Sequence, residues 1–134
     1  MVPSNDLLAL AGTIAGEIRG GTREQMENVA QVVLNRHNSG NRPTVRSVCL
    51  VPKQFSCWNP NDVNRSQITN IDVTEPDIWA ICLDVAHKAL IGQNPDRVGG
   101  AKNYFATASK DPWWLVGRYL ITLRDGAHTF VRFL

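Results

Sequence analysis

Apolar side chains recur at a helical spacing in three stretches of the chain, at about residues 4–21, 22–36 and 75–90. The first predicted helix begins near Ser4 or Asn5, both good N-caps, and ends at the glycine pair at 20 and 21. The second has the sequence of a capping box, with Thr22 as N-cap and Gln25 as its third residue. The third accepts Pro76 in its first turn and is closed by Gly92.

Beyond Gly92 the pattern changes to that of short strands. Residues 103–107 predict one strand, and residues 119–123 are expected to pair with 127–131 across a tight turn that contains Asp125 and Gly126. Residues 38–70, rich in Asn, Pro and Ser, predict a mostly irregular segment that lines a groove. The expected fold class is α+β, with a mainly helical body and a small antiparallel β-hairpin lobe.

Length and charge bound the kind of protein. At 134 residues with 43% apolar residues, the chain suits a single domain over residues 1–134. Its net charge of +2 is too small for a dedicated nucleic-acid protein, although ten arginines against four lysines would help it approach an anionic surface. A helix-turn-helix built from the first two helices fits poorly, so we expect no nucleic-acid partner.

The three cysteines are an odd set, so at least one thiol is unpaired within the chain. Cys82 lies on the apolar stripe of the third helix and is expected to be buried. Cys49 and Cys57 could form a disulfide only if the loop between them doubles back. Their spacing with the histidines matches no zinc pattern. We therefore expect free thiols, no metal and no cofactor.

Glu17 lies at the end of the first helix, directly before the glycine turn. At a helical pitch it projects beside Leu10 and Thr13, at the edge of the apolar face. A carboxyl that is half in the core loses hydration of its charged form, so its pKa should rise and it could act as a general acid near neutral pH. The other interpretation is a solvated glutamate at a helix end.

Several short motifs follow Glu17 in a characteristic order: Val-Val-Leu-Asn-Arg at 32–36, Gln-Phe-Ser at 54–56 and Gly-x-His-x-Phe at 126–130. This order resembles the SleB/CwlJ-type cell-wall hydrolases, known from spore-cortex lysis, from Asp6 to Phe130. The resemblance implies a lysozyme-like domain that cuts the glycan strands of peptidoglycan, and Glu17 corresponds to the essential glutamate of the family. The family usually carries a second acid shortly afterwards, where this chain has Gly21, so any role of that acid is in doubt.

Sugar sites need aromatic faces and short polar side chains. The predicted substrate-binding residues are Asn35, Gln54, Phe55, Ser56, Tyr104 and His128. Core packing explains Phe55 equally well and is favoured for the Trp113-Trp114 pair, and His128 is slightly favoured as a structural link between hairpin and body. Tyr104 corresponds to a tyrosine of the family and could face the groove, and Asn35 is expected to face the loop that follows its helix.

A single glutamate favours lytic transglycosylase chemistry, in which Glu17 protonates the glycosidic oxygen between N-acetylmuramic acid and N-acetylglucosamine and then acts as base. A hydrolytic muramidase is the alternative, and it needs a second carboxylate, for which Asp62, Asp72 and Asp111 are candidates. A silent glycan-binding or virion structural module is a further alternative.

The first apolar run is preceded by no Lys or Arg, so the sequence predicts no secretory signal, and no stretch approaches a membrane-spanning length. The expected partner is the peptidoglycan strand, met by a monomer at the bacterial cell wall. Such a chain could be a phage endolysin that waits in the host cytoplasm for release through a membrane hole, or a part of a virion.

Overall fold

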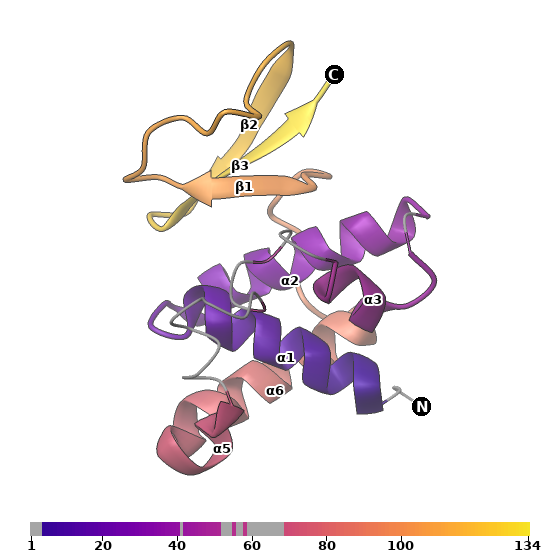
Figure 1. The fold of residues 1–134 in the computed structure, drawn as a ribbon, viewed down its shortest axis with the longest axis vertical. Coiled ribbons are helices and arrows are strands. Elements are labelled where there is room, and N and C mark those ends of the chain that lie inside the picture. Colours follow the sequence, from indigo (N-terminus) through magenta and orange to yellow (C-terminus); the bar gives the residue numbers. More distant parts are fainter. Residues whose placement is uncertain (1–3, 41, 52–54, 56–57, 59–68) are drawn as a thin grey trace.

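The computed structural model describes residues 4–40, 42–51, 55, 58 and 69–134 (Figure 1). Its helices are α1 (Ser4–Ile18), α2 (Arg23–Asn38), α3 (Val45–Cys49), α5 (Ile71–Thr74) and α6 (Pro76–Leu90). Its strands are β1 (Asn103–Ala106), β2 (Tyr119–Arg124) and β3 (His128–Phe133). The expected α+β class, with three main helices and a small antiparallel sheet, is confirmed.

The helical body is built around α1, which packs against α2, α3 and α6. Leu10 and Ile14 of α1 are fully buried, and Val33 of α2 and Val85 of α6 meet them in one core. The predicted capping box of α2 is present: Thr22 Oγ1 accepts from the backbone N–H of Gln25 at 3.2 Å, and Gln25 Oε1 accepts from the N–H of Thr22 at 3.0 Å.

The segment expected to be mostly irregular contains one short helix, α3, which the sequence analysis did not predict. Thr44 and Ser47 form a second capping box at its start, and Asp6 Oδ1 accepts from the backbone N–H of Arg46 at 3.0 Å. Five residues are too few to display a helical period, which is why the sequence pattern did not reveal α3. Much of the remaining segment lies outside the described residues.

The sheet has the strand order β1-β3-β2 and is antiparallel throughout, so the predicted hairpin and the separate first strand are both confirmed. Figure 1 shows the sheet at one end of the molecule, beside α2. Phe130 of β3 is fully buried in a second cluster with Val32 of α2, Val98 and Ala101. This cluster holds the sheet against the helical body.

Cys49 and Cys82 are buried free thiols. Burial raises the pKa of each to about 11, so both stay protonated at neutral pH. The expected burial of Cys82 is confirmed, whereas Cys57 lies outside the described residues. No helix within the described residues is long and apolar enough to cross a membrane.

Candidate functional site

Glu17 is half-buried at the C-terminal end of α1 and lines a hollow of about 440 Å³. The hollow lies where the end of α1 meets the starts of α2 and α6 and the hairpin turn of the sheet. Its lining comprises Gly16, Glu17, Ile18, Arg19, Gly20, Gly21, Gln25, Glu75, Ile78 and Ala127. A carboxyl with one side against the core and the other on an open hollow can exchange protons with a bound substrate.

A larger hollow, of about 870 Å³, lies at the opposite ends of α2 and α6. Its lining includes Asp6, His37 and His87, but none of the predicted site residues. Asp6 already accepts from the backbone of α3, and His37 contacts the carbonyl of Pro43 at 3.4 Å. We therefore place the candidate site at the smaller hollow, which contains a carboxyl able to do acid chemistry.

The hairpin turn is tied to α2 beside this hollow. Gln25 Nε2 donates to the carbonyl of Asp125 at 2.8 Å, and Asn28 Nδ2 donates to Asp125 Oδ2 at 3.0 Å. The other carboxylate oxygen of Asp125 accepts from the backbone N–H groups of Ala127 and His128 at 3.1 and 2.8 Å. These hydrogen bonds join two elements that are distant in sequence, α2 and the hairpin turn, beside the site.

A second acid, Glu75, lines the same hollow and was missed by sequence reasoning. Its carboxylate forms an ion pair with Arg19, whose Nε lies 3.3 Å from Glu75 Oε2. Of the second acids considered from sequence, Asp72 and Asp111 are exposed and line neither of these two hollows, and Asp62 lies outside the described residues. Glu75 has no motif around it, and only the packing of α6 against α1 brings it to Glu17.

Arg36 is a partly buried cation that interacts electrostatically with Glu17. Its guanidinium lies over the ring of Phe55, 4.7 Å from the centroid, and its Nε donates to the carbonyl of Lys102 at 2.6 Å. Burial lowers the pKa of Arg36, and the charges of Tyr104 and Glu17 oppose that shift, so the three groups lie within electrostatic range. Nη1 is buried and has no hydrogen-bond partner among the described residues.

The sequence analysis assigned Arg36 no role beside Glu17. Its sequence did offer one indication, because Arg36 follows an apolar stripe on the same helix. A charged side chain in such a position is rarely buried unless it is paired with another group.

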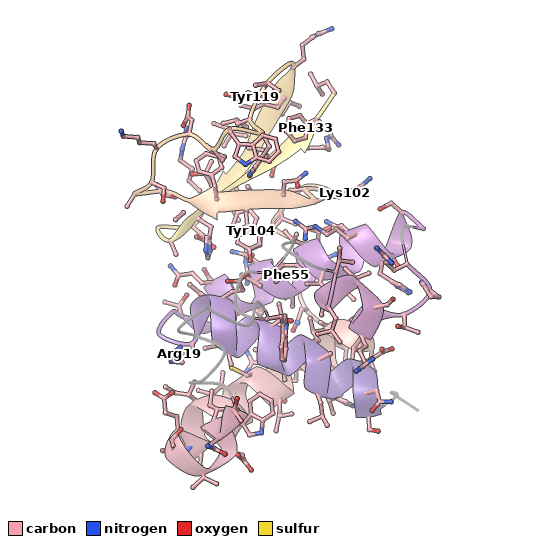
Figure 2. All side chains as sticks on the ribbon, viewed as in Figure 1. Arg19, Phe55, Lys102, Tyr104, Tyr119 and Phe133 are labelled. Atoms are coloured by element: carbon pink, nitrogen blue, oxygen red, sulfur yellow. The ribbon has the colours of Figure 1, made fainter. Side chains whose placement is uncertain are left out.

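Tyr104 and His128 come together, as expected of two residues from paired strands. Their ring centroids lie 4.5 Å apart, and Phe130 lies beside both at 5.5 and 6.1 Å. Figure 2 shows Tyr104 pointing from β1 toward the helical body, on the side of Phe55. Burial lowers the pKa of His128, against a smaller opposing effect of Asp125, so the ring is neutral at pH 7.

The remaining predicted residues divide into three groups. Asn35 hydrogen-bonds within the protein through both ends of its amide: its Oδ1 accepts from Gln31 at 3.0 Å and its Nδ2 donates to the carbonyl of Ala101 at 2.9 Å. It therefore faces the turn before β1, and the expectation that it faces the following loop was wrong. Phe55 is 1% exposed and reaches the site only through the guanidinium above it. Gln54 and Ser56 lie outside the described residues.

The tryptophans of the described residues differ in their surroundings. Trp58 donates from Nε1 to Thr13 Oγ1 at 2.8 Å, and its ring lies against Gly12, where a Cβ would come within 2.9 Å of it. Core packing was the favoured interpretation of the Trp113-Trp114 pair. It was wrong for Trp113, which is 90% exposed. Trp114 packs between Phe105 and Phe133 on the sheet face that points away from the helices.

Comparisons with known proteins agree with this architecture. Residues 20–131 match the model of a family described as cell wall hydrolase. The chain also matches the crystal structure of the catalytic domain of the Bacillus cereus SleB protein, with a TM-score of 0.74, 26% identity and coverage of 98% of this chain and 93% of that one. No curated protein gave a significant match. The expected lysozyme-like fold is confirmed by the structural match, which extends over the helix that carries Glu17.

Proposed function

Because the chain belongs to the cell wall hydrolase family, we propose that it is a lytic transglycosylase that cuts the bond between N-acetylmuramic acid and N-acetylglucosamine. Glu17 is proposed as its catalytic acid and base. The observation that carries this proposal is the half-buried carboxyl of Glu17 on a hollow between the helical body and the hairpin turn. A groove between two lobes is where an extended glycan strand can lie across an acid.

In the proposed reaction, protonated Glu17 gives its proton to the glycosidic oxygen while the bond to the muramyl anomeric carbon breaks. Positive charge builds on that carbon, and the new carboxylate lies on the same side of the sugar. The carboxylate then takes the proton of the muramyl 6-hydroxyl, whose oxygen bonds to the anomeric carbon. The products are a free glucosaminyl 4-hydroxyl and a 1,6-anhydro sugar, and Glu17 regains its proton.

Arg36 and Tyr104 are proposed to support this cycle. The guanidinium is held by Phe55 and by the carbonyl of Lys102, so its charge stays in place when Glu17 loses its proton. Because the cation is already in place, no free energy is needed to reorient it when negative charge develops on Glu17. Tyr104 and His128 are proposed to contact the sugar from the sheet side of the groove.

Hydrolysis by a muramidase is the second candidate, because Glu75 lines the same hollow as Glu17. The ion pair with Arg19 holds the carboxylate of Glu75 beside the hollow, where it could act on a water molecule. A hydrolase would release a reducing muramyl end instead of an anhydro end.

Mass spectrometry of the fragments released from purified peptidoglycan tests the proposal. We expect muropeptides with 1,6-anhydro ends, roughly 18 mass units lighter than hydrolysed ones because intramolecular attack replaces water. Glu17→Gln should lower the rate by at least about a hundredfold while the unfolding temperature stays close to that of the parent.

Glu75→Gln is the matched control for the mechanism. It should leave the anhydro product unchanged if Glu17 works alone. Reducing muramyl ends that disappear in Glu75→Gln would overturn the transglycosylase assignment in favour of the muramidase. A folded Glu17→Gln variant with normal activity would remove Glu17 from the mechanism.

A further inference from the structure

Three cations lie at one end of the sheet. Lys102 directly precedes β1, Arg118 directly precedes β2, and Arg132 is the next-to-last residue of β3. Because β3 lies between the other two strands and runs antiparallel to both, its end meets their beginnings. We call this end, formed by Lys102, Asn103, Arg118, Arg132 and Phe133, the sheet tip. Figure 2 shows Lys102 and Phe133 there, far from the turn at 125–127.

The charge of the chain is concentrated in this lobe. Residues 99–134 carry five Lys or Arg and two Asp, a balance of +3, whereas residues 1–98 have a balance of −1. In the helical body Arg19, Arg23, Lys88 and Arg97 form ion pairs. None of the five cations of the lobe forms an ion pair with another described residue. Positive charges that are not neutralised by nearby carboxylates create a positive potential, and this potential would attract an anionic partner.

The sheet tip is also hollowed. A cavity of about 240 Å³ is lined by Lys102, Asn103, Arg132 and Phe133. Two cations and an amide around a small cavity suit a carboxylate, and the ring of Phe133 gives the cavity an apolar wall.

Aromatic rings extend from the sheet tip across the outer face of the sheet. Phe133 lies 6.2 Å from both Trp114 and Tyr119, and Trp114 lies 6.1 Å from Phe105, all between ring centroids. Trp113, next in sequence to Trp114, is 90% exposed. An exposed indole of this kind can cover the apolar face of a pyranose. Tyr104 and Phe130 lie on the opposite, helix-facing side, so this surface is separate from the Glu17 site.

We propose that the sheet tip and Trp113 form an accessory anchor for the peptidoglycan strand. The cations bind carboxylates of the stem peptides, and Trp113 covers a sugar ring. The choice of partner rests on the proposed function, because peptidoglycan is a polymer that presents carboxylates and pyranose faces side by side. The anchor would hold the enzyme on insoluble wall between cleavage events.

Cosedimentation with insoluble peptidoglycan tests the anchor. All variants are made in the Glu17→Gln background, so that the strand is not cut during the measurement. Lys102→Glu and Arg132→Glu should each weaken binding by at least about fivefold, since each replaces an attraction by a repulsion, and added salt should weaken the parent in the same way. Trp113→Ala should weaken binding without changing its dependence on salt.

Arg42→Glu is the matched control, because it makes the same change in net charge at an exposed position of the helical body. It should change binding by less than about twofold at 0.15 M salt, where charges farther apart than the screening length act weakly. Equal losses in Arg42→Glu and Arg132→Glu would overturn the anchor in favour of a general charge effect. Unfolding temperatures of all variants confirm that each is folded.

Two treated substrates identify the anionic group. Amidating the carboxylates of the stem peptides with a carbodiimide and glycinamide should abolish the difference between the parent and Arg132→Glu. If that difference persists on the amidated wall and is lost only when phosphate-containing wall polymers are removed, the stem-peptide assignment is wrong. Cleavage of short soluble fragments should be unchanged by Arg132→Glu in the presence of Glu17, which separates failure of the anchor from failure of the proposed reaction.

Discussion

The side-chain amide of Gln25 joins the turn that follows Glu17 to the hairpin turn at Asp125. Its Oε1 accepts from the backbone of Thr22, and its Nε2 donates to the carbonyl of Asp125 at 2.8 Å, 100 residues away in sequence. One side chain therefore caps α2 and holds the sheet beside the hollow that Glu17 lines. The shape of this hollow depends on a hydrogen bond that neither element could make alone.

Gln25→Glu separates these two tasks. A glutamate still accepts from Thr22 and preserves the capping box, but it has no donor for the carbonyl of Asp125 and adds a negative charge to the hollow. We expect a loss of about 1–2 kcal/mol in the free energy of unfolding at pH 7, together with lower activity on peptidoglycan. Urea denaturation and a cleavage assay measure the two effects, and full stability of the variant would show that the bond to Asp125 contributes nothing.

Gly21→Ala and Gly20→Ala form a matched pair in the turn after Glu17. A Cβ at Gly21 would lie 2.5 Å from Gln25 Oε1 and 2.7 Å from Ile18 Cγ1, whereas a Cβ at Gly20 meets nothing within 4 Å. Gly21→Ala should therefore cost about 1–3 kcal/mol of stability, and Gly20→Ala less than about 1 kcal/mol. Thermal unfolding of both variants checks this, and equal stabilities would contradict it. The acid that the family usually carries at this position would need Gln25 to move.

Arg36→Met and Arg36→Lys separate charge from packing at the site. Methionine keeps part of the aliphatic stem over Phe55 but removes the cation that acts on Glu17. The high-pH limb of the activity profile should then move to higher pH, because a nearby cation no longer favours the ionised carboxyl. Arg36→Lys keeps the positive charge, so the high-pH limb should stay where it is in the parent. This variant should nevertheless be less stable, because it loses the hydrogen bond to the carbonyl of Lys102. A pH profile of peptidoglycan cleavage measures both, and parental limbs in both variants would exclude electrostatic action of Arg36.

His128→Phe tests the effect of pH on stability. Burial lowers the pKa of His128 below its ordinary value of 6.5, so on acidification the unfolded chain takes up a proton before the folded one does. This contribution is present above about pH 6.5 and is lost as the pH falls through and below that value. The parent should therefore lose more stability than His128→Phe between pH 7.5 and pH 5 in urea denaturation. Equal losses would show that His128 titrates normally in the folded protein.

The helices and the hairpin were predictable because their signals are local. The capping box at Thr22, the proline that opens α6 and the turn at Asp125-Gly126 each act within a few residues. Glu17 could be placed at the edge of the α1 core for the same reason, since the helical period alone sets which side chains share a face. The order of the motifs then indicated the family.

Only the tertiary structure decided which groups surround Glu17. Glu75 and Arg36 come to the site through the packing of α6 against α1 and of α2 beneath β1, and the sequence around each does not show that it will lie near Glu17. Trp113 looks like a core residue by type, yet it is exposed because Trp114 takes the place between the aromatic rings of the sheet. Periodicity and capping report the interactions of a residue with its neighbours in the chain. The neighbours of Glu17 are set by packing between elements far apart in sequence, which leaves no local trace.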